Sequence, residues 1–140
     1  MKILLPVDGS PCSTRAAKYL VRHFVHLGSR PEVVVLAVDP PLLEELTRHV
    51  LPEDIARFHS RNGHAAFKPV RRLLDAAGIA YGENLRVGEP GESIAAFAKK
   101  QRCDLIVMGS HGRGALKALL LGSVVTQVLA RSTIPVLVVR

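Results

Sequence analysis

The sequence predicts an α/β fold, a doubly wound five-stranded parallel sheet in the strand order 3-2-1-4-5 with helices on both faces. Five short apolar runs alternate with stretches whose apolar residues recur at helical spacing, which is typical of a parallel sheet covered on both sides. Right-handed crossovers then leave few topologies, of which this order is one. At 140 residues and 48% apolar content, we expect one domain, residues 1–140.

The first expected strand is the apolar run 3–7, which Asp8-Gly9-Ser10 brings to an end. Ser10 is a good helix N-cap, and Pro11 behind it suits the first helical position. Apolar residues then recur at helical spacing, so a helix is expected to about Leu27.

The second strand is expected at residues 32–38, a run rich in β-branched residues that Asp39-Pro40-Pro41 stops. Residues 42–77 are expected to be mostly helical. Gly63 and Pro69 interrupt that pattern, and because proline inside a helix costs about 3 kcal/mol, we expect a kink or break between residues 62 and 69. This helix is expected to leave the functional site untouched.

The later elements continue the alternation. The run ending at residues 85–87 is less apolar, which suits an edge strand, and a helix is expected over 92–100. A strand over 104–108 leads into a glycine-rich loop, a helix follows to about Ala130, and residues 134–139 form the last strand.

The glycine-rich loop indicates a phosphate site. It reads Gly109-Ser110-His111-Gly112-Arg113-Gly114 and is followed by Gly122-Ser123, with Lys117 between. Glycines leave backbone N–H groups open to an anion, and Ser123 could N-cap a helix whose positive end also favours one. A plain turn is the alternative, but two glycine segments with cations between them favour phosphate.

The fold places this loop in a crevice. In a doubly wound sheet, ligands bind outside the carboxyl ends of the strands where the winding reverses, here between the first and fourth strands. The loop at Asp8-Gly9-Ser10 should therefore meet the glycine-rich loop, with Val38 at the rim.

Several other chemistries are disfavoured. The chain lacks G-x-x-x-x-G-K-[ST], and its first strand-to-helix turn lacks G-x-G-x-x-G. No metal site is expected, because His23 and His26 share a helix face without a spaced acidic or cysteine partner. His111 is expected to be a loop contact rather than an acid or base, because no positioned nucleophile accompanies it.

The net charge and the cysteine content limit the possible binding partners and the cellular compartment. The net charge is +7, yet it is dispersed and the chain has only four Phe, two Tyr and no Trp, so nucleic acid is an unlikely partner. No membrane span is expected, because the apolar stretch 118–130 is too short. Two distant cysteines and the absence of a signal-like start predict a cytoplasmic protein.

Taken together, three motifs resemble the universal stress protein family across the whole chain. They are Gly109-x-x-Gly112 with nine residues before Gly122-Ser123, the segment Pro6-Val7-Asp8-Gly9-Ser10, and Pro135-Val136-Leu137-Val138-Val139. The glycine spacing resembles the ATP-binding branch of that family. This resemblance implies a cytoplasmic stress-response regulator that binds ATP with Mg²⁺ or Mn²⁺ on its phosphates and is not an enzyme. A slow ATPase or nucleotidyl transferase using the same crevice is the alternative.

The resemblance also implies roles for particular residues. Asp8 and backbone groups of Val7 and Val38 would hold the adenosine, with Met108 and Gly109 near the ribose. Pro6 is also expected at the binding site. The phosphates would be surrounded by Ser110, His111, Gly112, Arg113, Gly122, Ser123 and Val124. A homodimer would pair the last strands of two copies through Val136, Leu137, Val138 and Val139, because an apolar edge strand is rarely left open. A monomer in which a neighbouring helix protects this strand is the alternative.

Overall fold

A computed structural model describes residues 1–24, 30–112 and 121–140. Within these ranges strands and helices alternate, apart from two successive helices between the second and third strands. The elements are β1 (Lys2–Val7), α1 (Pro11–Phe24), β2 (Glu32–Asp39), α2 (Glu44–Thr47), α3 (Pro52–Ala76), β3 (Tyr81–Val87), α4 (Pro90–Lys100), β4 (Leu105–Gly109), α5 (Ser123–Arg131) and β5 (Val136–Val139).

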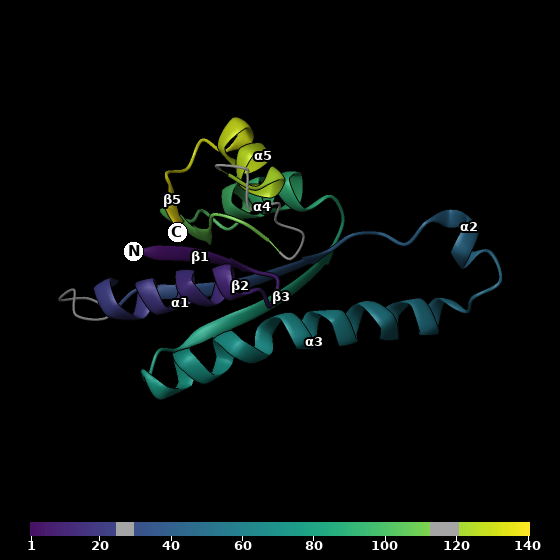
Figure 1. Cartoon of the computed structure of the whole chain (residues 1–140), viewed down its shortest axis with the longest axis horizontal. Helices are drawn as coiled ribbons and strands as arrows, with labels where there is room; N and C mark the ends of the chain where they lie inside the picture. The colour runs from purple at the N-terminus through teal and green to yellow at the C-terminus, as the bar shows by residue number, and fades with distance from the viewer. Residues whose placement is uncertain (25–29, 113–120) are drawn as a thin grey trace.

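The strands form one parallel five-stranded sheet in the order β3-β2-β1-β4-β5, which confirms the predicted topology. Helices α1 and α3 cover one face, and α4 and α5 cover the other (Figure 1). Successive side chains of a strand point to opposite faces. In β1, Ile3 and Leu5 therefore belong to the core under α1 and α3, and Leu4 belongs to the core under α4 and α5.

Helix α1 begins as predicted. The Ser10 side-chain oxygen accepts a hydrogen bond from the backbone N–H of Ser13 at 3.2 Å, and Pro11 is the first helical residue. The predicted continuation to Leu27 lies partly outside the described residues.

Helix α3 runs unbroken through Gly63 and Pro69, so the expected break is wrong. Around the proline the helix buries Phe67, Val70 and Leu74. Burying one side chain of this kind contributes roughly 1.5–3 kcal/mol, so three of them outweigh the cost of about 3 kcal/mol for a helical proline. Tertiary packing therefore holds the helix together.

Strands β3 and β5 are the two edges of the sheet. Side chains of β3 are exposed or half-buried, as its modest apolar content predicted. Those of β5 are also half-buried: Leu137 and Val139 pack toward α1 and α3, and Val136 and Val138 pack toward α4 and α5. Among the described residues, no strand pairs with the outer edge of β5.

None of the described helices has the length and apolar character that crossing a bilayer requires.

Candidate functional site

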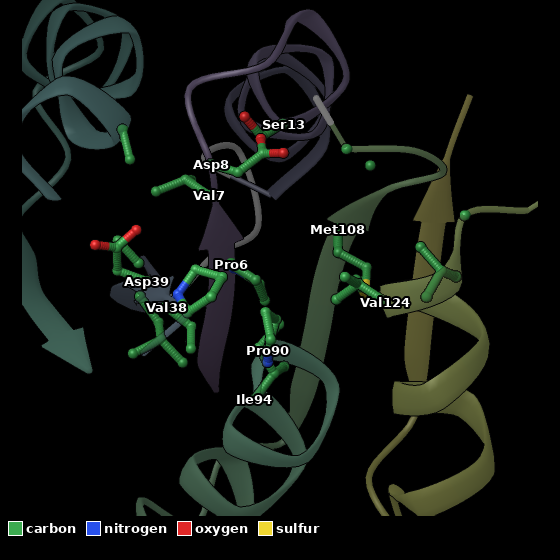
Figure 2. Close-up of a pocket in the computed structure, with 18 of the residues that line it drawn as sticks. Pro6, Val7, Asp8, Ser13, Val38, Asp39, Pro90, Ile94, Met108 and Val124 are labelled. Atoms are coloured by element: carbon green, nitrogen blue, oxygen red, sulfur yellow. The ribbon is translucent and has the colours of Figure 1, made fainter. Parts of the chain in front are cut away.

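A cavity of about 450 Å³ opens at the carboxyl ends of β1, β2 and β4 (Figure 2). Its floor is formed by Pro6 and Val7 of β1, Val38 of β2 and Met108 of β4. Strand β1 lies between β2 and β4, so the cavity lies where the winding of the sheet reverses, which is where doubly wound proteins bind ligands.

The structure brings nearly all of the predicted site residues to this cavity. Those that line it are Pro6, Val7, Asp8, Val38, Met108, Gly109, His111, Gly112, Gly122, Ser123 and Val124. Ser110 does not line it. Arg113 lies outside the described residues, as do Gly114 and Lys117.

Ser110 supports the glycine-rich loop from behind. It is 2% exposed, and its backbone N–H donates to the carbonyl oxygen of Val139 at 2.9 Å. Its carbonyl oxygen accepts from the N–H of Gly122 at 2.8 Å, and its hydroxyl lies 3.0 Å from Nδ1 of His111. Ser110 thus joins the loop to β5 and to the start of α5.

The predicted N-cap of α5 is wrong by one residue. Gly122 occupies the N-cap position without a side-chain cap, and Ser123 is the first helical residue. The N–H of Gly122 is bonded to the carbonyl oxygen of Ser110, and Ser123, one residue further along, lines the cavity. The free N–H groups of the first turn of a helix favour an anion.

The loops after β1 and β4 meet, as predicted. An added Cβ atom at Gly112 would lie 3.0 Å from Oδ2 of Asp8. The other carboxylate oxygen of Asp8 accepts a hydrogen bond from the backbone N–H of Ser10 at 2.9 Å, which orients the carboxylate across the crevice. One acidic side chain therefore faces the glycine-rich loop.

Helix α3 forms a wall of the cavity through Asn62, Gly63 and Ala66, so the expectation that this helix leaves the site untouched is wrong. The approach is close, because a Cβ atom at Gly63 would lie only 2.9 Å from the Leu85 side chain of β3. Glycine at this buried position lets α3 lie against the edge strand. A glycine on the buried side of a predicted helix was the feature of the sequence that could have indicated this close approach.

The remaining residues that line the cavity were not predicted from the sequence. They come from the ends of β2 and β3 and from the faces of α1, α4 and α5: Ser13, Leu36, Ala37, Asp39, Pro40, Leu85, Pro90, Ile94 and Val125. Most are apolar and were expected to be core or turn residues. The cavity therefore combines an apolar interior with a glycine-rich rim.

A polar cluster lies where β2 meets α3. Nδ1 of His59 is 2.6 Å from Oδ2 of Asp39, and Nδ2 of Asn62 donates to the same oxygen at 2.9 Å. His59 is buried, with 6% of its surface exposed, whereas Asp39 and Asn62 line the cavity. No sequence motif pointed to this cluster, because its members are 20 and 23 residues apart.

In the part of the chain that the structure describes, no three His, Cys, Asp or Glu side chains gather as metal ligands would. A divalent cation in this cavity would thus need a ligand's own oxygens for most of its coordination.

The strand order and the cavity at its switch point define a doubly wound α/β protein with a glycine-lined crevice. The model of the universal stress protein family matches residues 1–140, so the chain belongs to this family. It is 34% identical to universal stress protein MJ0531 of Methanocaldococcus jannaschii over 99% of this chain and 81% of the relative.

Solved structures share the fold. The structure of MJ0577, a universal stress protein of Methanocaldococcus jannaschii, matches with a TM-score of 0.81 and 31% identity over 99% of this chain and 94% of that one. A universal stress protein in complex with cAMP matches with a TM-score of 0.74 and 23% identity over 100% and 97% of the two chains.

Proposed function

We propose that this protein binds ATP in the cavity and acts as a nucleotide-dependent regulator in the stress response. The observation that carries the proposal is the joining of two glycine segments and a helix N-terminus at one rim of the cavity. Backbone N–H groups and the positive end of α5 suit phosphate there. Relatives of the same fold have been solved with cAMP, AMP and dAMP, which supports an adenine nucleotide as the ligand class.

The phosphates would lie against the glycine-rich rim. His111, Gly112 and Val124 would offer backbone N–H groups, and Ser123 would add its hydroxyl. Gly122, whose N–H is bonded to Ser110, would border the phosphates without a side chain. Ser110 would position this rim without touching the ligand, since its polar groups are engaged within the protein.

The adenosine would lie over the apolar floor. Met108 and Gly109 would border the ribose, and Pro6, Val7 and Val38 would contact the base. Asp8 projects from the end of β1 between these regions, where its carboxylate could accept from a ribose hydroxyl (Figure 2). Mg²⁺ or Mn²⁺ would be held by the phosphates, because the described residues supply few ligands.

Binding rather than turnover is the proposed activity. Phosphoryl transfer needs an oriented water or nucleophile besides stabilisation of charge. Asp8 and His111 are the titratable side chains that line the glycine-rich end of the cavity, and one carboxylate oxygen of Asp8 accepts from the N–H of Ser10. Universal stress proteins are generally regulators, which favours the same proposal.

The test is identification and titration of the ligand. Mass spectrometry of small molecules released from the purified protein should detect an adenine nucleotide. Calorimetry on the emptied protein should then show one ATP bound per chain. Absence of binding by ATP, AMP and cAMP alike to a folded protein would contradict the proposal.

A further inference from the structure

The wall of the cavity far from the glycine-rich rim is polar at one point. Asp39 is the last residue of β2, and β1 lies between β2 and β4. Neighbouring strands are about 4.8 Å apart, so the ends of β2 and β4 are separated by roughly 10 Å. A nucleotide whose phosphates lie against the loop after β4 would extend its base toward Asp39. This step depends on the proposed function.

The Asp39 carboxylate is held in one orientation. A contact of 2.6 Å between Nδ1 of His59 and Oδ2 of Asp39 requires a hydrogen on that nitrogen, because two acceptors would repel each other at this distance. Asn62 donates to the same oxygen at 2.9 Å. Both partners belong to α3, so the carboxylate is fixed against that helix.

The second oxygen of this carboxylate is available to a ligand. Oδ1 of Asp39 accepts no hydrogen bond from the residues that the structure describes, and the side chain is 16% exposed in the wall of the cavity. A partly buried carboxylate oxygen is a strong acceptor that gains from a donor. Val38 and Ala66 line the same cavity and offer apolar surface to a flat ring, whose edge would then meet this oxygen.

We propose that Asp39, positioned by His59 and Asn62, recognises the 6-amino group of adenine and so selects adenine nucleotides over 6-oxopurine nucleotides. The amino group of adenine donates to Oδ1. Hypoxanthine and guanine carry a carbonyl oxygen at the same place, and a carboxylate repels it. Losing a hydrogen bond to a charged group and leaving that group unpaired costs at least about tenfold in affinity.

The isosteric substitution Asp39→Asn should reverse the preference. His59 and Asn62 both present donors, so the new amide turns its oxygen toward them. Its NH₂ group then occupies the place of Oδ1 and faces the base. A donor at this point opposes the adenine amino group and suits the 6-carbonyl of inosine.

The experiment is calorimetric titration of ATP and inosine triphosphate into the wild-type protein and Asp39→Asn. We expect the wild-type protein to bind ATP at least about tenfold tighter than inosine triphosphate and the variant to equalise or reverse that ratio. Asp54→Asn is the matched control, since Asp54 lies in the exposed first turn of α3 and outside the cavity, and it should keep the wild-type ratio.

The outcomes separate the two proposals. If the wild-type protein binds ATP but Asp39→Asn keeps the wild-type ratio, the role of Asp39 is overturned while ATP binding stands. If the wild-type protein binds no nucleotide, the proposed function itself fails.

A second measurement does not depend on the variant folding. N6,N6-dimethyl-ATP cannot donate from the 6-position, and the wild-type protein should bind it at least about tenfold more weakly than ATP. Equal affinity for the two nucleotides would also overturn the inference.

Discussion

The backbone N–H of Gly122 donates a hydrogen bond to the carbonyl oxygen of Ser110 over 2.8 Å. This bond joins the end of β4 to the start of α5 across the residues between them. A Cβ atom at position 122 would lie 3.2 Å from the same oxygen, so a larger residue would press on this contact. The two glycine segments are therefore held together before any ligand arrives, which lowers the ordering cost of binding.

Gly112→Val should abolish or strongly weaken ATP binding. Its Cβ atom would lie 3.0 Å from Oδ2 of Asp8, and its methyl groups would enter the space proposed for phosphate. We expect affinity to fall at least about tenfold, or 1.4 kcal/mol, in calorimetry.

Gly82→Val is the matched control, because no atom lies within 4 Å of a Cβ atom at this position on β3. Both variants should keep the wild-type circular dichroism spectrum. Wild-type ATP affinity in a folded Gly112→Val protein would remove the glycine-rich rim from the phosphate site.

ATP hydrolysis should be far slower than ordinary enzymatic turnover, because phosphoryl transfer needs an oriented water or nucleophile. Among the described residues, Asp8 and His111 are the titratable side chains that line the glycine-rich end of the cavity. We expect phosphate release well below about 1 per second, the low end of typical enzyme rates. A coupled phosphate assay with Mg²⁺ or Mn²⁺ measures it. Faster turnover that His111→Ala abolishes would favour the enzyme alternative instead.

Val138→Pro should separate a homodimer formed through β5. The carbonyl oxygen of Pro135 accepts from Ile106 of β4, and that of Val139 accepts from Ser110 just after β4. By the two-residue period of a strand, the N–H of Val138 therefore points to the open edge. Proline there removes a donor from the proposed antiparallel pairing and none from the bonds to β4.

Light scattering at micromolar concentration should give a dimeric mass for the wild-type protein and for Val138→Ala, and a monomeric mass for Val138→Pro. A monomeric wild-type protein would contradict this interface, and a dimeric Val138→Pro protein would place it elsewhere.

Cys103 should resist alkylation in the folded protein. Burial raises the pKa of its thiol, so less thiolate is present at pH 8, and only 6% of the residue is exposed. Cys12 is half-buried near the surface of α1 and should react faster with iodoacetamide.

Peptide mass spectrometry after timed labelling compares the two cysteines, and labelling in denaturant is the control, where both should react alike. Raising the pH should speed the labelling of Cys103 as its thiolate forms. Equal rates in the native protein would contradict the burial of Cys103.

Much of the fold follows from local sequence patterns. The apolar runs of β1, β2 and β4 are continuous because both faces of those strands are buried, and this pattern alone predicts a central parallel strand. The handedness of crossovers then limits the strand order to a few arrangements, of which the observed order is one, and the cavity follows from the strand order. Residues next to a strand end, such as Asp8 and Gly112, could therefore be assigned to the site without coordinates.

The contribution of α3 to the wall of the cavity was decided only by the tertiary structure. Proline and glycine within residues 62–69 locally favour a break, yet the packing of Phe67 and Leu74 keeps the helix whole. The same packing turns Asn62 toward the end of β2, where it meets Asp39 beside His59. Contacts between residues far apart in the chain depend on how a helix is rotated and how closely it approaches the sheet, and neither is encoded in a local motif. The sequence by itself determined the sheet and the glycine-rich rim, whereas the polar wall opposite that rim exists only because long-range burial outweighs local helix propensity.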